Sequence, residues 1–248
     1  EPNDYNRWAN NGNPIWAFDN VLPYFKKLEN DQDFSGEFHG DRGYIPVERS
    51  KRKDWLPEQA AFYERCISLG FSSCPDHNKP YSTGVGPLPL NCFNSIRQST
   101  LITYLNPVRH RPNLEIIANA FVTKLNLIGK RVEGVSFHHK GIVRTVSTSK
   151  VCISAGAINT PQLLMCSGIG PSQHLESLGI RIVQDLPGVG QNLCDHPSIN
   201  LEWQLAESFP INIDQPFHQV ALRCTSEGSK NVNDIIIYVG CNSRQKRM

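Results

Sequence analysis

Residues 151–170 read VCISAGAINTPQLLMCSGIG, and this stretch decides the fold class. Residues 151–153 form a continuous apolar run, which is typical of a strand covered on both faces. The small residues Ala155, Gly156 and Ala157 follow, and residues 160–166 have the composition of a helix. The stretch therefore predicts an interior parallel strand at residues 151–154, a small-residue turn and a helix, which is an α/β arrangement.

A turn built from Ala155, Gly156 and Ala157 has two interpretations. Only small side chains let a dinucleotide approach the backbone at the carboxyl end of a sheet, so the turn could face a cofactor. Any α/β protein also needs small residues where a strand meets a helix. The turn by itself does not decide between these two interpretations.

Four β-rich runs precede this stretch, with polar or glycine-containing turns between them. The runs at residues 122–127, 132–137 and 142–146 predict an antiparallel meander, because short turns join them. The run at residues 114–118 predicts a further short strand before the meander.

The first part of the chain predicts two helices, an edge strand and a loop. Residues 19–28 have helical spacing of apolar side chains, with Pro23 in the first turn of the helix, where a missing N–H is tolerated. Residues 57–69 predict a second helix, with proline at its first position and glycine after its last. Residues 44–47 predict an edge strand, because proline cannot donate to a central ladder, and residues 75–89, with four prolines, predict a loop.

Composition excludes several classes of partner. The chain has 248 residues, with 25 Lys and Arg against 23 Asp and Glu, so no basic surface for nucleic acid is expected. The longest apolar runs, such as residues 235–239, are too short for a membrane span. The eight cysteines form no C-x-x-C pair, so no metal site is expected, and Cys152 and Cys166 are predicted to be buried thiols.

Fifteen consecutive positions, residues 156–170 with the sequence GAINTPQLLMCSGIG, resemble the second signature of the glucose-methanol-choline (GMC) oxidoreductase family. Sequence around them supports the same resemblance, in RPNL at 111–114, DLPGVGQNL at 185–193 and DHP at 195–197. The stretch GNPIW at 12–16, and His39-Gly40 with Gly43, are similar to the glucose dehydrogenase-like branch common in insects.

The resemblance implies an FAD cofactor and a fold in which flavin and substrate domains are interleaved along the chain, α/β in the flavin domain and α+β in the substrate part. It places residues 34–74 and 112–197 in the FAD-binding domain, and residues 1–33, 75–111 and 198–248 in the substrate-binding or lid domain. It also implies cofactor contacts from the main chain of Val122, which would bind the adenine, and from Ser154, Ala155 and Gly156 near the adenosine.

Other parts of the family's machinery are not expected in this chain, which resembles an internal fragment. The family holds the FAD pyrophosphate with an N-terminal G-x-G-x-x-G turn. Here the glycine pairs at 168–170 and 188–190 imitate only its first half and are predicted to be turn glycines. The family's catalytic histidines would lie C-terminal of Met248. The local histidines receive structural interpretations, with His196 hydrogen-bonded near a turn and the others, His110, His138 and His139, facing solvent.

The resemblance implies oxidation of a CH–OH group in a small alcohol or sugar, with hydride passing to FAD and electrons then passing to oxygen, a quinone or another acceptor. It fixes neither the substrate nor the acceptor, and a secreted location is compatible with it. The alternative is a non-catalytic, truncated paralogue that keeps only the scaffold. A nicotinamide dehydrogenase is disfavoured, because no complete dinucleotide fingerprint is present. This chain alone is expected to be inactive.

Overall fold

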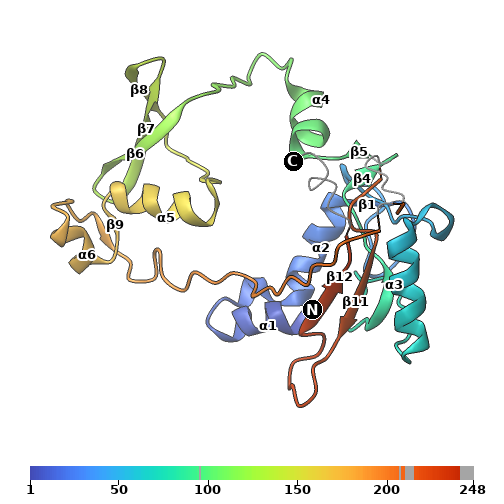
Figure 1. Ribbon diagram of the computed structural model, residues 1–248. Helices are drawn as coiled ribbons and strands as arrows, with labels where there is room; N and C mark the ends of the chain where they lie inside the picture. The colour runs from blue at the N-terminus through green and yellow to red at the C-terminus, as the bar shows by residue number, and fades with distance from the viewer. Residues whose placement is uncertain (95, 207, 210–214, 241–248) are drawn as a thin grey trace. The chain divides into compact units, whose positions relative to one another are not determined.

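The computed structural model describes residues 1–94, 96–206, 208–209 and 215–240 (Figure 1). The chain forms two compact units, the first from Glu1–Leu114 together with the described residues from Gln204 on, and the second from the intervening residues 115–203. Both units contain helices and strands, which confirms the mixed α/β class. Among the described helices, none is long and apolar enough to cross a membrane.

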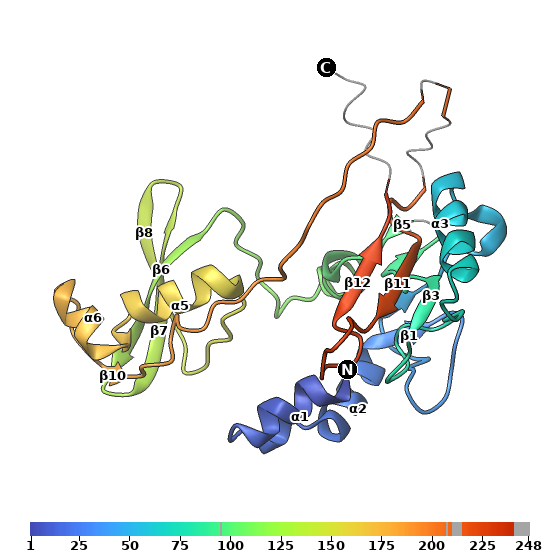
Figure 2. The same ribbon diagram turned by 60° about the horizontal axis from the view of Figure 1, so that its bottom comes forward.

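A three-stranded sheet with one covering helix forms the core of the first unit (Figure 2). Its order is β12 (Ile235–Tyr238), β11 (Val220–Cys224) and β3 (Gly84–Pro87), and both pairings are antiparallel. Helix α3 (Pro57–Ser68) packs on this sheet. It ends one residue before the end predicted from the sequence. The buried residues of the cluster between them are Cys66, Val85, Val220 and Leu222.

Two buried glutamines hold α3 and the segment before it on β11. Gln59 is fully buried, and its amide oxygen accepts hydrogen bonds from the N–H groups of Gln219 (3.2 Å) and Val220 (3.1 Å). Gln219 is also fully buried, and its side-chain oxygen accepts from the N–H of Leu56 at 2.7 Å. Buried amide groups of this kind are retained only when they are paired, so these contacts fix the position of α3.

The prediction of a loop at residues 75–89 is wrong in its second half, where β3 lies. Val85 is fully buried, and its N–H and C=O pair with the backbone of Ser72 and Cys74. A Cβ on Gly86 would overlap the carbonyl oxygen of Cys74. Gly84 and Gly86 resemble turn residues in the sequence, but they are glycines because the backbone of residues 72–74 lies against them.

The N-terminal part of the first unit contains α1 (Pro2–Asn10) and α2 (Phe18–Leu28), followed by a parallel pair of short strands, β1 (Glu29–Asp31) and β2 (Ile45–Val47). The strand β2 confirms the predicted edge strand. Pro23 lies in the second turn of α2 and not in the first, because the helix begins at Phe18. The first N–H of this helix, that of Phe18, donates a hydrogen bond to the side-chain oxygen of Asn6 in α1 at 3.0 Å.

Short elements complete the first unit. They are the 3₁₀ turns Pro14–Trp16 and Arg52–Asp54, the hairpin of β4 (Cys92–Phe93) and β5 (Ile96–Arg97), the π-helical turn Leu101–Leu105 and α4 (Asn106–Val108).

The second unit confirms the predicted meander. Strands β6 (Phe121–Ile128), β7 (Arg131–His139) and β8 (Ile142–Ser147) form an antiparallel sheet in that order. Helix α5 (Gly156–Cys166) packs against β6, and Ser167 after it accepts a hydrogen bond from the Leu125 N–H at 2.9 Å. The unit is completed by the parallel pair β9 (Ile169–Gly170) and β10 (Gln184–Asp185), and by α6 (Ser172–Ser177) with the fully buried Leu175.

Two predicted strands in this unit are wrong. Residues 114–118 and 151–154 are irregular. A strand needs a neighbour to receive its backbone hydrogen bonds, and the described residues provide no ladder partner for either segment. The helix after residue 154 is present and begins earlier than predicted, at Gly156. How the chain divides between the flavin and substrate domains of a longer protein stays a prediction.

Candidate functional site

Val122, the residue predicted to bind adenine through its main chain, lies near the start of β6 opposite Phe137. Val122 is exposed, with 39% of its surface accessible to solvent. The pairing of β6 with β7 shifts register between Val122 and Lys124, which is a β-bulge or a similar irregularity. Bulges interrupt the ladder and leave main-chain groups available for other partners.

Ser154, Ala155 and Gly156 form the junction between the irregular segment and α5, and all three are exposed. Gly156 has φ +84°, in the region that favours glycine. A Cβ built on Gly156 meets no atom within 4 Å, so the space beside this backbone is open. No side chain caps the N-terminus of α5, and no acidic residue lies in its first turn. The junction can therefore admit a ligand group that accepts hydrogen bonds.

Several other predicted residues lie elsewhere than expected. Cys152 and Cys166 are exposed and not buried, because an apolar run in sequence does not show which of its side chains face the core. The side chain of His196 is fully exposed, and its Nδ1 lies 4.0 Å from Asp195 Oδ1, so the structural hydrogen bond predicted for this imidazole is not formed among the described residues. His110 and His138 are exposed as predicted, but His139 is half-buried with a buried Nδ1, so its predicted solvent exposure is wrong.

A second cluster, which sequence reasoning did not assemble, lies in the first unit. We call it the ionic cluster, and its members are Glu29, Asp31, Asp33, His39, Arg49, Lys51 and Asp76. Arg49 is buried, and its guanidinium donates to both oxygens of Asp31 and to Oδ1 of Asp76, all at 2.9 Å. Nη1 makes both bonds to Asp31 and Nη2 makes the bond to Asp76, and this pairing of one cation with two carboxylates compensates for the burial of the charges.

His39 lies between the carboxylates of the ionic cluster. Its Nε2 is 2.8 Å from Asp76 Oδ2, and its Nδ1 is 3.2 Å from Asp31 Oδ2 and 3.6 Å from Glu29 Oε2. His39 is 7% exposed, and within the described structure its Nδ1 has no hydrogen-bond partner of acceptable geometry. The three nearest ligand atoms of Glu29, Asp31 and His39 lie within 4.8 Å of one another.

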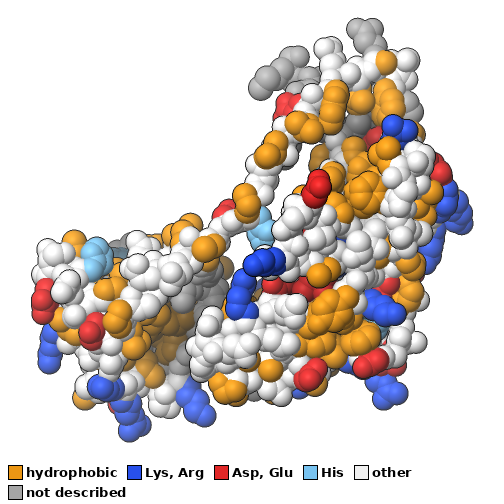
Figure 3. All heavy atoms as spheres, turned by 90° about the horizontal axis from the view of Figure 1, so that it is seen from below, with side chains coloured by type: hydrophobic (Ala, Val, Ile, Leu, Met, Phe, Trp, Pro, Cys, Tyr) orange, Lys and Arg blue, Asp and Glu red, His pale blue; other side chains and the backbone are white. Residues whose placement is uncertain are grey.

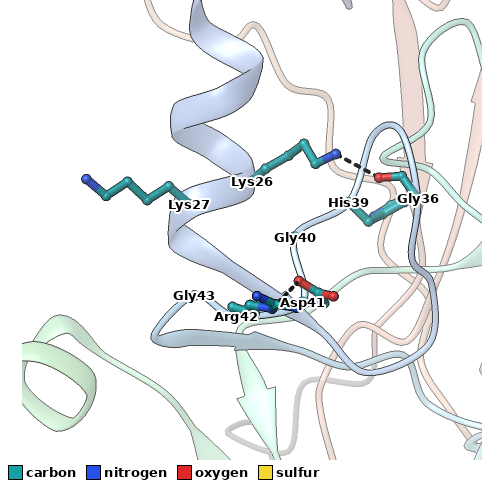
Figure 4. Close-up of a pocket in the computed structure, with 8 residues that line it drawn as sticks. All are labelled: Lys26, Lys27, Gly36, His39, Gly40, Asp41, Arg42 and Gly43. Carbon is teal, nitrogen blue, oxygen red and sulfur yellow. Dashed lines mark hydrogen bonds and ion pairs between the residues drawn. The ribbon is translucent and has the colours of Figure 1, made fainter.

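The loop that carries His39 packs against the end of α2 and lines an open cavity of about 470 Å³ (Figure 4). Lys26 reaches across to the loop and donates to the carbonyls of Gly36 (2.8 Å) and Glu37 (2.9 Å), whereas Lys27 points away. A Cβ on Gly40 would overlap a carbonyl oxygen of α2, so only glycine allows this packing.

Next to the ionic cluster, Cys74 and His77 form a buried pair. The thiol sulfur is 3.5 Å from His77 Nδ1, and His77 Nε2 is 3.2 Å from the Gly86 carbonyl. Burial lowers the pKa of His77 and raises the pKa of the Cys74 thiol. Both shifts favour neutral partners, so the pair has the character of a structural contact and not of an activated nucleophile.

Comparison with known proteins identifies the family to which most of the chain belongs. Residues 1–198 match the family model described as GMC oxidoreductase. The chain is 39% identical over 219 residues, 88% of its length and 44% of the relative, to an uncharacterized GMC-type oxidoreductase of Rhodococcus erythropolis. It is 40% identical over 204 residues, 81% of its length and 36% of the relative, to an oxygen-dependent choline dehydrogenase of Staphylococcus xylosus.

Among solved structures, pyridoxine 4-oxidase from Mesorbium loti matches with a TM-score of 0.70 and 31% identity, over 75% of this chain and 37% of that one. The class that fold and sequence define is thus an oxidoreductase. The chain belongs to the GMC oxidoreductase family, whose cofactor is FAD. It spans about two fifths of the length of the curated relatives it matches. The relatives named here are bacterial, so the similarity to the insect branch stays a prediction.

Proposed function

We propose that this chain is the part of an FAD-dependent oxidoreductase that contacts the adenosine end of the cofactor, in an enzyme that oxidises the CH–OH group of a small alcohol or sugar. The observation that carries the proposal is the family match over residues 1–198, which includes the exposed junction before α5. Relatives named as choline dehydrogenases support an alcohol substrate.

The local geometry is compatible with the cofactor contact. The open space beside Gly156 would let a dinucleotide lie against the main chain, and the uncapped N-terminus of α5 offers N–H groups without helical acceptors. The irregular pairing after Val122 supports a role for its main chain in binding the adenine. FAD itself supplies the hydride acceptor when bound.

The proposed substrate is a small alcohol or sugar, and the proposed final electron acceptor is oxygen, a quinone or another acceptor.

The alternative function is that of a scaffold without catalytic activity. An enzyme and a scaffold differ in whether bound flavin is reduced by an alcohol.

The test uses a chimera in which this chain replaces the matching segment of the Staphylococcus xylosus choline dehydrogenase. In that protein, Gly156→Leu should lower the flavin content per folded protein at least tenfold, because the side chain would fill the open space that the cofactor is proposed to occupy. Gly179→Leu is a matched control, since Gly179 also has a positive φ (+69°) and nothing within 4 Å of its Cβ.

Both substitutions place a bulky residue in a left-handed conformation, so both carry a similar backbone strain. Only Gly156→Leu should lose flavin absorbance. Equal flavin content in the two variants would remove the junction from the cofactor site. Flavin that stays oxidised with choline, glucose and simple primary alcohols in the unsubstituted chimera would favour the scaffold interpretation.

A further inference from the structure

The arrangement of Glu29, Asp31 and His39 in the ionic cluster has the geometry of a metal centre, and we propose that these three residues bind a Zn²⁺ ion. The ligand atoms are Glu29 Oε2, Asp31 Oδ2 and His39 Nδ1. The proposal concerns the first unit alone and is independent of the flavin contact proposed for the second.

The two separations that involve His39 Nδ1 agree with tetrahedral coordination, and all three ligand atoms lie within 4.8 Å of one another. Zinc bonds to nitrogen and oxygen are about 2.0–2.2 Å long, which places neighbouring tetrahedral ligands about 3.4 Å apart. His39 Nδ1 lies 3.2 Å from Asp31 Oδ2 and 3.6 Å from Glu29 Oε2. A cation among the three atoms would therefore need only small movements of the side chains.

The unpaired nitrogen of His39 points to a bound cation in the same place. Because Nε2 faces Asp76 Oδ2 at 2.8 Å, it is the donor of the ring, which leaves a lone pair on Nδ1 in the neutral imidazole. That lone pair faces two carboxylate oxygens in a site where His39 is 93% buried. Lone pairs directed at one another are stable only with a cation or a proton between them.

The outer contacts of the three ligands match those of known zinc sites. Histidine ligands usually donate their other N–H to a carboxylate, as His39 does to Asp76. Glu29 Oε2 accepts the N–H of Gly40 at 2.8 Å, and Arg49 orients Asp31. Asp31 Oδ2 accepts a hydrogen bond from Arg49 alone among the described residues, so one of its lone pairs is free for a metal.

The charge balance favours a divalent ion. With a neutral imidazole, the ionic cluster holds four carboxylates against two permanent cations, Arg49 and Lys51, which leaves two negative charges in a largely buried place. A single Zn²⁺ neutralises them, whereas a proton on His39 neutralises one. Of the three ligands, His39 also lines the 470 Å³ cavity. A water molecule would complete the four ligands of a tetrahedral zinc ion.

This site lacks the paired cysteines and histidines by which zinc sites are recognised in a sequence. The ligands here are spaced as Glu-x-Asp in β1 and a histidine eight positions after the aspartate, on a glycine-rich loop. That spacing alone is not specific.

The experiment uses the 248-residue chain, dialysed against a chelator and titrated with CoCl₂ and then ZnCl₂. We expect one equivalent of Co²⁺ to give the visible bands of four-coordinate cobalt, without the thiolate charge-transfer band that cysteine ligands would produce. One equivalent of Zn²⁺ should displace it. In the apo chain, nitrogen NMR of the His39 ring should show a change at Nδ1 when Zn²⁺ is added.

Glu29→Gln keeps an acceptor for the Gly40 N–H but removes a charged ligand, so it should weaken Co²⁺ and Zn²⁺ binding at least tenfold. His39→Gln should do the same, with folding checked by circular dichroism. The matched control is Asp41→Asn, because Asp41 lines the same cavity but is exposed and lies outside the ionic cluster. The affinity of this variant for Co²⁺ and Zn²⁺ should stay within twofold of the unsubstituted chain.

The proposal is overturned by any of three results on the unsubstituted chain: no binding at one equivalent, binding that depends on thiolates, or a His39 ring that keeps protons on both nitrogens when Zn²⁺ is present. The last result would identify a proton as the cation. Unchanged affinity in Glu29→Gln would also overturn it, and this variant decides the matter if His39→Gln does not fold.

Discussion

The interiors of the two units differ in kind. The first unit buries many polar and charged side chains, namely Asp31, His39, Arg49, Gln59, Asp76, His77, Thr103 and Gln219. In the second unit the buried side chains are Leu125, Phe137, Leu175 and Ser167. Large apolar residues are exposed in both units, for example Ile15 at 74% in the first and Phe121 at 72% in the second. Figure 3 shows hydrophobic side chains at the surface among charged ones.

The comparison distinguishes buried polar groups that stabilise the first unit from exposed main-chain groups that are available for binding in the second. Paired charges and buried amides fix the first unit, because removing one partner leaves a desolvated group unpaired. The second unit has a small core and carries the proposed cofactor contacts on exposed main chain. Apolar surface of this extent usually contacts a partner or another part of a protein.

The largest expected effect concerns the second unit's proposed chemistry. The 248-residue chain, purified alone, should neither retain stoichiometric FAD nor oxidise any alcohol. It contains no complete G-x-G-x-x-G turn, and the loss of a preorganised acid–base group alone lowers rates by about 10² to 10⁴. Flavin absorbance and dye reduction with glucose or choline are the measurements. A yellow, monomeric preparation that reduces the dye would contradict this prediction.

The next effect tests the charged interior of the first unit. Arg49→Met should lower the free energy of unfolding by about 3–5 kcal/mol, because Asp31 and Asp76 would stay buried after losing the guanidinium that pairs with both. Urea denaturation in metal-free buffer, followed by circular dichroism, measures it.

The matched control lies in the second unit. Arg131 is exposed and pairs with Glu133 at 3.3 Å, so Arg131→Met should cost at most about 1 kcal/mol. Equal losses in Arg49→Met and Arg131→Met would mean that the contrast between the two interiors has no energetic basis.

Local patterns in the sequence predicted the regular elements well. Strands β6, β7 and β8 follow from alternating apolar residues between glycine turns, and α3 follows from its proline start and glycine end. Helix α1 was not predicted, although Pro2 and Asp4 in its first turn are favourable signals. Its aromatic residues pack on later ones, Trp8 against Trp16 for example, with ring centroids 5.9 Å apart.

Features that depend on contacts between distant segments could not be predicted. Nothing local in residues 151–154 indicates that no strand lies beside them, and nothing local to Gly86 shows that the Cys74 carbonyl approaches it. The same limit applies to the ionic cluster. The sequence marked His39 within a glycine-rich motif, but Asp76 reaches it from a segment 37 positions away. Val122, Ser154, Ala155 and Gly156 stay predictions as cofactor contacts.

A smaller effect follows from the buried imidazole of His77. Burial lowers its pKa, so the folded chain resists protonation there while the unfolded chain is protonated below about 6.5. Its full contribution to stability is therefore present above pH 6.5 and is lost as the pH falls through the lowered pKa of the folded state. Urea midpoints at pH 7 and pH 5 should show less acid sensitivity in His77→Gln than in the original chain. The exposed His138 is the control, and His138→Gln should leave the sensitivity unchanged.

The smallest effect concerns an exposed charge in the β11–β12 hairpin, and it completes the contrast between buried and exposed groups. Asp234 has a pKa lowered to about 2, first by the Ser226 hydroxyl and then by the Ser226 N–H, which donate at 2.6 and 2.8 Å. Ser226→Ala removes the hydroxyl but keeps the N–H, so the pKa should rise only part of the way to the ordinary 3.8. Carboxyl NMR titration measures the shift. Because water surrounds Asp234, the urea midpoint at pH 7 should change little, in contrast to Arg49→Met. A full return to 3.8 would mean that the N–H contributes nothing, and an unchanged pKa would mean that the hydroxyl does not bind the carboxylate in solution.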